Sequence, residues 1–213
     1  MKQFIIGRKL GMTQIFGEKG IVVPVTVVQA GPCVVVQLKT KEKEGYDAIV
    51  IGFEDIKKNR ANKPMAGAFK KANVTPKRVL REFHVEDINA FKVGDTITCE
   101  TFNVGDMIDV TSRTKGRGFT GTIKRWNFHR QKETHGNSRS VRVPGSLGAN
   151  SDPSRVFKNK KMPGQYGNEQ VTILNLTIAG VDKDKNCLLV KGGIPGPEGV
   201  LVSVRNAVKG GAK

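Results

Sequence analysis

One segment in the middle of the chain, residues 113–168, constrains the fold more than any other. It contains eight glycines, three prolines and many Asn, Ser and basic residues, and no apolar periodicity runs through it. Such a stretch cannot bury enough apolar surface to fold alone. Strand-forming sequence resumes after it, so we interpret the segment as an excursion that leaves a folded body and returns. An insertion of about fifty structureless residues in a compact domain is normally functional or disordered.

Positive charge is concentrated in this excursion and in one shorter segment. The 213 residues include 36 Lys and Arg against 19 Asp and Glu, which gives a formal net charge of +17. Residues 57–81 hold nine basic residues and no acid, and residues 113–161 hold thirteen against two acids. The rest of the chain is therefore slightly acidic, at −3. Because a large charge excess repels itself, we expect a polyanionic partner, with sulfate, acidic proteins and anionic membranes as alternatives.

The body is predicted to be mostly β-structure. Runs rich in Val, Ile and Phe end at Gly, Pro or charged turns, as strands do. These runs cover residues 2–6, 12–16, 20–29, 32–39, 48–53, 171–178, 187–190 and 199–204. Two Gly-Asp turns, at Gly94 and Gly105, repeat at a spacing of eleven residues, and each precedes a short strand. Strands this short and frequent favour a closed barrel or a sandwich. Short helices are expected at 63–72 and 76–83, each with a proline near its start.

Several classes of protein are not expected. The longest uncharged stretch, residues 20–38, is interrupted by Pro24 and Pro32 and fits two strands better than a membrane span. The N-terminus has too few consecutive apolar residues for a signal peptide. Three cysteines, odd in number and far apart, predict neither a disulfide framework nor a zinc site, and they favour a reducing cytosolic compartment.

Three motifs of the excursion are candidates for polyanion contact, and each has a simpler alternative. Glycines alternate with cations in 115–121, which lets the backbone approach phosphates, although the motif also suits a flexible turn and lacks nucleotide-loop spacing. Trp126 lies among cations and either stacks on an unpaired base or packs the root of the excursion. Residues 145–154 are small and nearly uncharged, and they form either a narrow tip or an ordinary exposed loop.

Catalytic groups are not evident in the sequence. His84, His129 and His135 are far apart, and the two acids of the excursion, Glu133 and Asp152, stand alone. No carboxylate pair, His-x-x-x-His pair or neighbouring cysteine accompanies them, so no catalytic or metal-binding residue and no cofactor is predicted. The chain is not expected to be an enzyme.

The run Phe102-x6-Asp109-x2-Ser112-x-Thr114-x-Gly116-Arg117-Gly118-x2-Gly121-x3-Arg125 resembles the signature of the large-subunit ribosomal protein L-three (L3) family. The resemblance extends to residues 6–16, 134–138, 142–146, 160–165 and 193–197. It covers essentially the whole chain, and the compact length is similar to the bacterial or organellar branch. Some members carry a methylated glutamine in the tip. No Gln lies between Gln131 and Gln165 here, so that modification is not expected.

The resemblance implies a mostly β fold: a six-stranded translation-protein-type β-barrel with a small α-containing insertion and a long irregular basic extension. The expected division is a barrel body of residues 1–53, 91–120 and 168–213, a basic insertion with short helices at 54–90, and an extended RNA-penetrating loop at 121–167. It also implies binding to large-subunit (23S-type) rRNA, a role in nucleating subunit assembly, and a tip near the peptidyl transferase centre. The implied location is the ribosome in the cytoplasm, beside proteins L-fourteen and L-nineteen, with no membrane and no small-molecule substrate.

The residues predicted to touch RNA are many of the cations of both basic segments, the signature glycines, Trp126 and two histidines. They are Lys57, Lys58, Arg60, Lys63, Lys70, Lys71, Lys115, Gly116, Arg117, Gly118, Gly121, Lys124, Arg125, Trp126, His129, Arg130, Lys132, His135, Arg139, Arg142, Arg155, Lys158, Lys160 and Lys161. The predicted tip is Gly145, Ser146, Leu147, Gly148, Ala149, Asn150, Ser151, Asp152, Pro153 and Ser154. The alternatives that remain are an RNA-modifying enzyme and a non-ribosomal architectural protein that binds nucleic acid.

Overall fold

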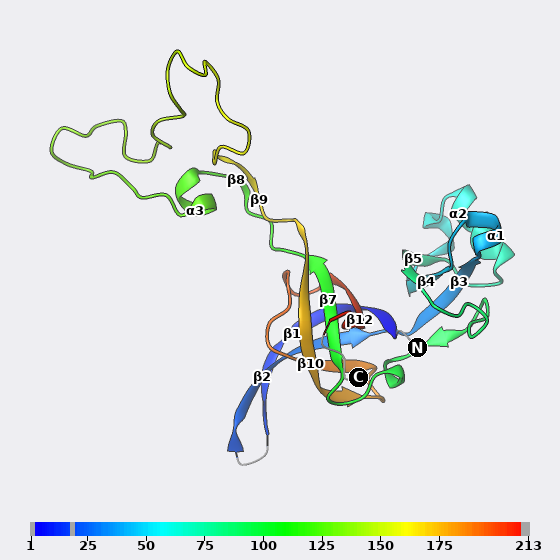
Figure 1. The fold of residues 1–213 in the computed structure, drawn as a ribbon. Coiled ribbons are helices and arrows are strands. Elements are labelled where there is room, and N and C mark those ends of the chain that lie inside the picture. Colours follow the sequence, from blue (N-terminus) through cyan, green and yellow to red (C-terminus); the bar gives the residue numbers. More distant parts are fainter. Residues whose placement is uncertain (1–2, 18–19, 210–213) are drawn as a thin grey trace. The chain divides into compact units, whose positions relative to one another are not determined.

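The computed structural model describes residues 3–17 and 20–209, without the side chain of Lys58. It is mostly β, as expected from the sequence. The chain divides into two compact units, one of residues 1–113 and 170–213 and the other of residues 114–169. We call the first unit the body and the second the arm, and each is described by itself (Figure 1).

Six strands of the body form a closed sheet. They are β1 (Phe4–Phe16), β2 (Val22–Ala30), β7 (Met107–Arg113), β10 (Gln170–Asp182), β11 (Cys187–Lys191) and β12 (Leu201–Asn206). The order is β1-β12-β7-β10-β11-β2, and β2 pairs again with β1. Neighbouring strands are antiparallel throughout. Closure of this kind leaves no unpaired edge at which another chain could add a strand.

Strand β1 is longer than the sequence indicated. Two strands were expected at 2–6 and 12–16, yet residues 4–16 form one strand with a register shift between Lys9 and Gly11. The shift lies close to where β1 changes partner, because residues 4–8 pair with β12 and residues 7–16 pair with β2. A local irregularity of this kind bends a strand, as the wall of a closed sheet requires.

A second sheet of the body has the order β5-β4-β3-β6. Its strands are β3 (Cys33–Lys39), β4 (Ala48–Asp55), β5 (Lys77–His84) and β6 (Thr96–Ile97). Residues 33–53, expected in the barrel, therefore pair outside the closed sheet. Strand β3 hydrogen-bonds to β4 and β6. It does not join the closed sheet beside β2, because β1 and β11 already pair with the two sides of β2. Buried residues of both sheets, such as Ile5 and Val204 with Ile49 and Ile51, share one hydrophobic core.

The helix predicted at 76–83 is wrong, because these residues form strand β5. Apolar residues recur at Val79 and Phe83, which lie opposite Phe53 and Ile49 of β4. Lys77 is buried at the start of the strand, and its ammonium lies 2.8 Å from Oδ1 of Asp55. Pairing with β4 and this ion pair outweigh the helical signal of Pro76.

The helices of the body are short. They are α1 (Lys41–Glu44), α2 (Lys63–Lys71) and the 3₁₀ turns η2 (Lys58–Arg60) and η3 (Cys99–Thr101). Helix α2 confirms the predicted helix at 63–72, with Pro64 in its first turn and Phe69 buried. The two Gly-Asp turns share one geometry, because Gly94 and Gly105 both have positive φ and each aspartate accepts a nearby backbone N–H. Among the described helices, none combines the length and apolar character needed to cross a membrane.

A salt bridge joins the two sheets of the body. Nε and Nη2 of Arg8 in β1 donate to the two carboxylate oxygens of Glu54 in β4, the latter at 2.9 Å. The Arg8 guanidinium holds the pKa of Glu54 below its usual range. Glu54 has a φ of 57°, a backbone conformation that is costly for a residue with a side chain. The two-point ion pair fixes the side chain of this strained residue.

A buried carboxylate of β7 binds the backbone of β10 where that strand is irregular. Asp109 of β7 is 0% exposed, and its two oxygens accept backbone N–H groups from Asn175 at 3.1 Å and Val208 at 3.3 Å. The Asn175 bond stabilises an irregularity in β10, where Asn175 has a φ of 55° and the pairing with β7 shifts. The side chain of Arg205 lies 3.7 Å from the same carboxylate.

The Asp109→Ala variant should be less stable than the wild type by about 2 kcal/mol or more. Two buried N–H groups lose their acceptor, and each unsatisfied group costs about 1–3 kcal/mol. Denaturant unfolding measures the effect. Asp184→Ala in the exposed turn between β10 and β11 is the control and should change stability by less than about 0.5 kcal/mol. Equal effects of the two substitutions would contradict the role given to Asp109.

Replacing the arm by a two-residue Asn-Gly turn should leave a folded body. Arg113 and Gln170 are Cα partners in the β7–β10 ladder, so a tight turn can join them. Circular dichroism and backbone-amide NMR would test the expectation. Loss of the β-type spectrum in the shortened chain would mean that the arm is part of the core.

Candidate nucleic-acid interface

The root of the arm is a small folded element. Strand β8 (Gly118–Thr120) pairs antiparallel with β9 (Gly164–Tyr166), and helix α3 (Thr122–Trp126) follows β8. Two further hydrogen bonds extend the pairing, from Thr114 N–H to the Glu169 carbonyl and from Arg117 N–H to the Tyr166 carbonyl. Gly167 is required here, because a Cβ atom would lie 2.0 Å from the Lys115 carbonyl oxygen. The two limbs of the arm are therefore held together where they begin.

Trp126 ties the two limbs together at one carbonyl. Its indole N–H donates to the Met162 carbonyl at 2.9 Å, and the Arg125 guanidinium donates to the same oxygen at 3.0 Å. Arg125 and Lys161 also lie over the indole ring, at 4.9 and 5.7 Å from its centre. The side chain thus has a packing role within the arm, although 38% of the residue is exposed. Stacking on a base stays a prediction.

The glycine-rich motif 115–121 lies along β8 and leads into α3. Lys115, Arg117 and all three glycines of the motif are exposed. Gly118 has a φ of 62°, a conformation that glycine adopts without a steric penalty. The Arg117 guanidinium lies 5.4 Å from the centre of the Tyr166 ring, so the opposite limb orients it. The glycine backbone and the two cations of this motif are therefore exposed to solvent, next to and along the short strand β8.

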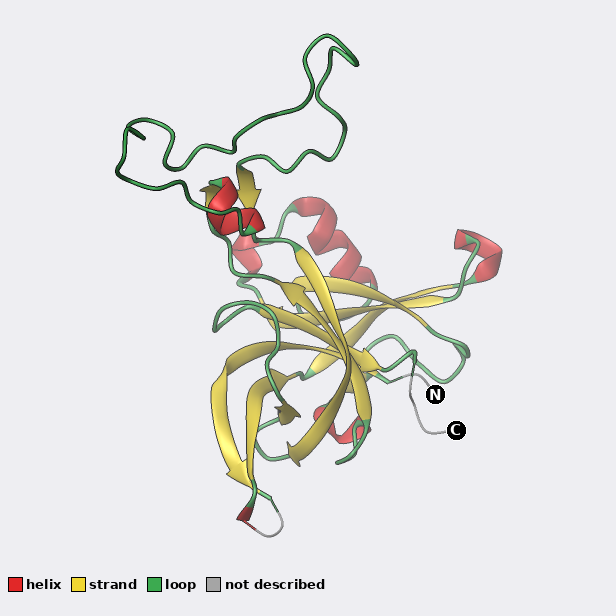
Figure 2. Cartoon of the chain, turned by 60° about the vertical axis from the view of Figure 1, so that its left-hand side comes forward, coloured by secondary structure: helices red, strands yellow, loops and turns green. Residues whose placement is uncertain are grey.

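Beyond α3 the arm contains no helix or strand until β9 (Figure 2). The predicted RNA-binding cations of this stretch are all exposed: Arg130, Lys132, Arg139, Arg142, Arg155, Lys158, Lys160 and Lys161. His129 and His135 are exposed as well. Arg130 pairs with Glu133, whereas Arg155 lies over the Phe157 ring. The exposed cations of this region therefore form few ion pairs with one another or with acids of the arm.

The predicted tip, residues 145–154, is exposed except at Pro153, which is partly buried. Two of its serine hydroxyls donate to nearby backbone carbonyls of the tip. The Ser146 hydroxyl donates to the Gly148 carbonyl at 3.2 Å, and the Ser154 hydroxyl donates to the Ser151 carbonyl at 2.5 Å. Gly145 has a φ of 79°. These features describe a compact turn of small residues.

The shorter basic segment surrounds helix α2 in the body. Lys57, Arg60, Lys63, Lys70 and Lys71 are exposed, while the side chain of Lys58 lies outside the described part. Phe69 fixes the helix to the body because it is 1% exposed. The segment is not uniformly available to a partner, since its Lys77 is buried against Asp55.

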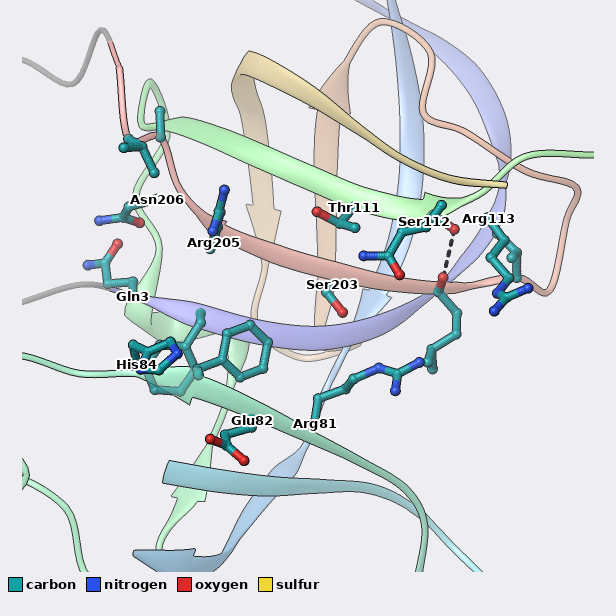
Figure 3. Close-up of a pocket in the computed structure, with 17 residues that line it drawn as sticks. Gln3, Arg81, Glu82, His84, Thr111, Ser112, Arg113, Ser203, Arg205 and Asn206 are labelled. Carbon is teal, nitrogen blue, oxygen red and sulfur yellow. Dashed lines mark hydrogen bonds between the residues drawn. The ribbon is translucent and has the colours of Figure 1, made fainter. Parts of the chain in front are cut away.

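Three arginines that sequence analysis did not select line one cavity of the body. Arg81 of β5, Arg113 of β7 and Arg205 of β12 border a space of about 660 Å³ (Figure 3). They come from strands that are distant in the sequence, so no local motif marks them. The one available signal was that Arg81 and Arg113 stand at the ends of the two basic segments.

The three histidines of the described residues lie on different segments of the chain, and the three cysteines are buried. His84 lies on β5 beside the Tyr46 ring at 5.3 Å, while His129 and His135 belong to the arm. Cys33, Cys99 and Cys187 are buried free thiols, and burial raises the pKa of Cys33 to about 11. Within residues 3–17 and 20–209, no three His, Cys, Asp or Glu side chains are grouped closely enough to hold a metal ion.

A comparison with known protein families gives the family of the chain. The model of the family "Ribosomal protein L3" matches residues 82–187, from the end of β5 through the whole arm to the first residue of β11. The match includes Asp109, the glycine-rich motif, Trp126 and the tip. The chain therefore belongs to the ribosomal protein L3 family, whose members are structural proteins of the large ribosomal subunit.

Proposed function

We propose that this protein binds large-subunit (23S-type) rRNA through its arm and helps to nucleate assembly of the subunit. The observation that supports the proposal is the exposed positive charge of the arm, in which twelve basic residues face only three acids. Phosphate groups supply the missing partners, and each neutralised phosphate releases condensed counterions. The match to the ribosomal protein L3 family supports this choice, because large-subunit rRNA is a polyanion of that subunit.

The arm is suited to enter folded RNA rather than to lie on its surface. Its root is narrow and held by the β8–β9 pair and the Trp126 bonds, while its outer part has no hydrogen-bonded sheet to break on binding. A segment of this composition loses its conformational entropy only when it binds, and RNA contacts compensate for the loss. We propose that the small-residue tip, 145–154, reaches toward the peptidyl transferase centre, where bulky side chains do not fit.

The body acts as the platform of the arm in this proposal. We propose that its closed sheet is a barrel of the translation-protein type and that the exposed lysines around α2 bind RNA as a second, smaller contact. The protein supplies no catalytic group and no cofactor, so its effect on the nearby RNA is conformational. The proposed location is the cytoplasmic ribosome, where L-fourteen and L-nineteen are the proposed neighbours.

The affinity for purified large-subunit rRNA should depend steeply on salt. With six or more phosphate contacts, the logarithm of the affinity falls with the logarithm of salt concentration at a slope of about −4 or steeper. Filter binding from low to moderate potassium chloride measures this slope. A nearly flat dependence would rule out binding by counterion release.

Two matched double variants test whether the salt dependence of RNA binding comes from the arm. Arg139→Ser/Arg142→Ser removes two exposed arm cations and should make the slope shallower by about 1.4. Lys183→Ser/Lys185→Ser removes the same charge from an exposed turn of the body and should leave the slope unchanged. If both pairs reduce the slope equally, the interaction is a general effect of net charge and the arm has no special role.

A further inference from the structure

The cavity noted above lies within the body, between strand β5 of the second sheet and strands β7 and β12 of the closed sheet. Its volume of about 660 Å³ falls within the range of small-molecule sites. Phe4 and Phe83 form an apolar wall, with ring centres 4.8 Å apart and nearly parallel planes. The sequence predictions assigned no role to this space.

One end of the cavity is cationic. Figure 3 shows Arg81 and Arg113 at this end, and Arg205 between it and the opposite end. The acids nearby are already engaged. Glu82 bonds to Lys39, and Asp109 accepts two backbone N–H groups besides lying 3.7 Å from Arg205. Arg81 has no hydrogen-bond or ion-pair partner among the described residues, so its guanidinium is available to an anion.

The other end carries two unpaired amide oxygens. Gln3 Oε1 and Asn206 Oδ1 are both shielded from water and receive no hydrogen bond within the described residues. Figure 3 shows the two amides close to each other, with His84 beside them. An acceptor removed from water without a donor is destabilising, so an occupant with N–H groups at this end gains affinity from satisfying them.

We propose that this cavity binds one nucleotide, with its phosphate at the Arg81 and Arg113 end and the N–H edge of its base at Gln3 and Asn206. A guanidinium pairs with phosphate through charge-assisted, often bidentate hydrogen bonds. The apolar wall of Phe4 and Phe83 suits the base between these ends. The assignment rests on the proposed function in one respect, since an unstacked nucleotide of the bound rRNA is its natural source. A free nucleotide has the same chemistry.

The cationic end alone would accept inorganic phosphate, so the test compares the two ligands. Guanosine monophosphate (GMP) is the probe, because guanine presents two N–H groups side by side on one edge. GMP and inorganic phosphate are titrated separately into the full chain, and backbone-amide NMR shifts are followed in β5, β7 and β12. GMP should bind at least about tenfold more tightly than phosphate and should shift these strands.

Two sets of variants locate the contacts. Arg81→Ser should weaken GMP binding by about tenfold, the usual effect of losing one charge-assisted contact. Arg78→Ser is the matched control, because it removes the same charge from the same strand outside the cavity and should have little effect. Gln3→Met/Asn206→Leu keeps the volume of both side chains without their acceptors and should abolish the preference for GMP over phosphate.

The outcomes separate this inference from the proposed function. If GMP binds no better than phosphate, or if Arg81→Ser and Arg78→Ser behave alike toward GMP, the nucleotide site is wrong even where rRNA binding stays salt-dependent. If GMP binds as expected, the two arginine variants are then compared on purified large-subunit rRNA. A greater loss with Arg81→Ser identifies an RNA nucleotide as the occupant, and equal losses identify a free nucleotide. Failure of the wild type to bind rRNA overturns the proposed function alone.

Discussion

The antiparallel pairing of β7 with β10 is the constraint on which the rest of the structure depends. Because Arg113 and Gln170 are partners in that ladder, the arm leaves the body and returns to it at adjacent positions. The sheet can therefore close whatever the length or composition of the arm. Asp109 reinforces the same pair of strands, since it lies on β7 and binds the backbone of β10 at Asn175. A chain with this arrangement can carry a long polar insertion without adding the polar residues of that insertion to the core of the body.

The distribution of charge follows from the same arrangement. A folded body tolerates few unpaired charges at its core, and the buried Lys77 and the inter-sheet Arg8 are both paired with acids, Asp55 and Glu54. The arm has no core to disturb, so its cations can stay exposed until a partner neutralises them. The arm holds 12 basic and 3 acidic residues and therefore carries more than half of the net charge of +17, while the body keeps the second basic segment around α2.

Strand content and the approximate position of the arm were predictable because both depend on local composition, although residues 114–120, expected in the barrel, belong to the arm. Helix α2 was predictable from Pro64 and its neighbours, and β2 and β3 from the proline and glycine that separate them. Strand β5 was mistaken for a helix because its partner β4 lies over twenty residues earlier, and sequence periodicity does not report that pairing. The partition of strands between two sheets was missed for the same reason.

The error at β5 also explains why the cavity was not foreseen. In a strand, residues two apart share a face, so Arg81 and Phe83 point to the same side. Phe83 packs on Phe4 of β1, and Arg81 is thereby brought to the face that β12 and β7 border. In a helix the two side chains would have diverged by about 200°. The cavity therefore exists only because the two sheets pack together, and the chemistry of its ends comes from residues at both extremes of the chain, Gln3 and Asn206.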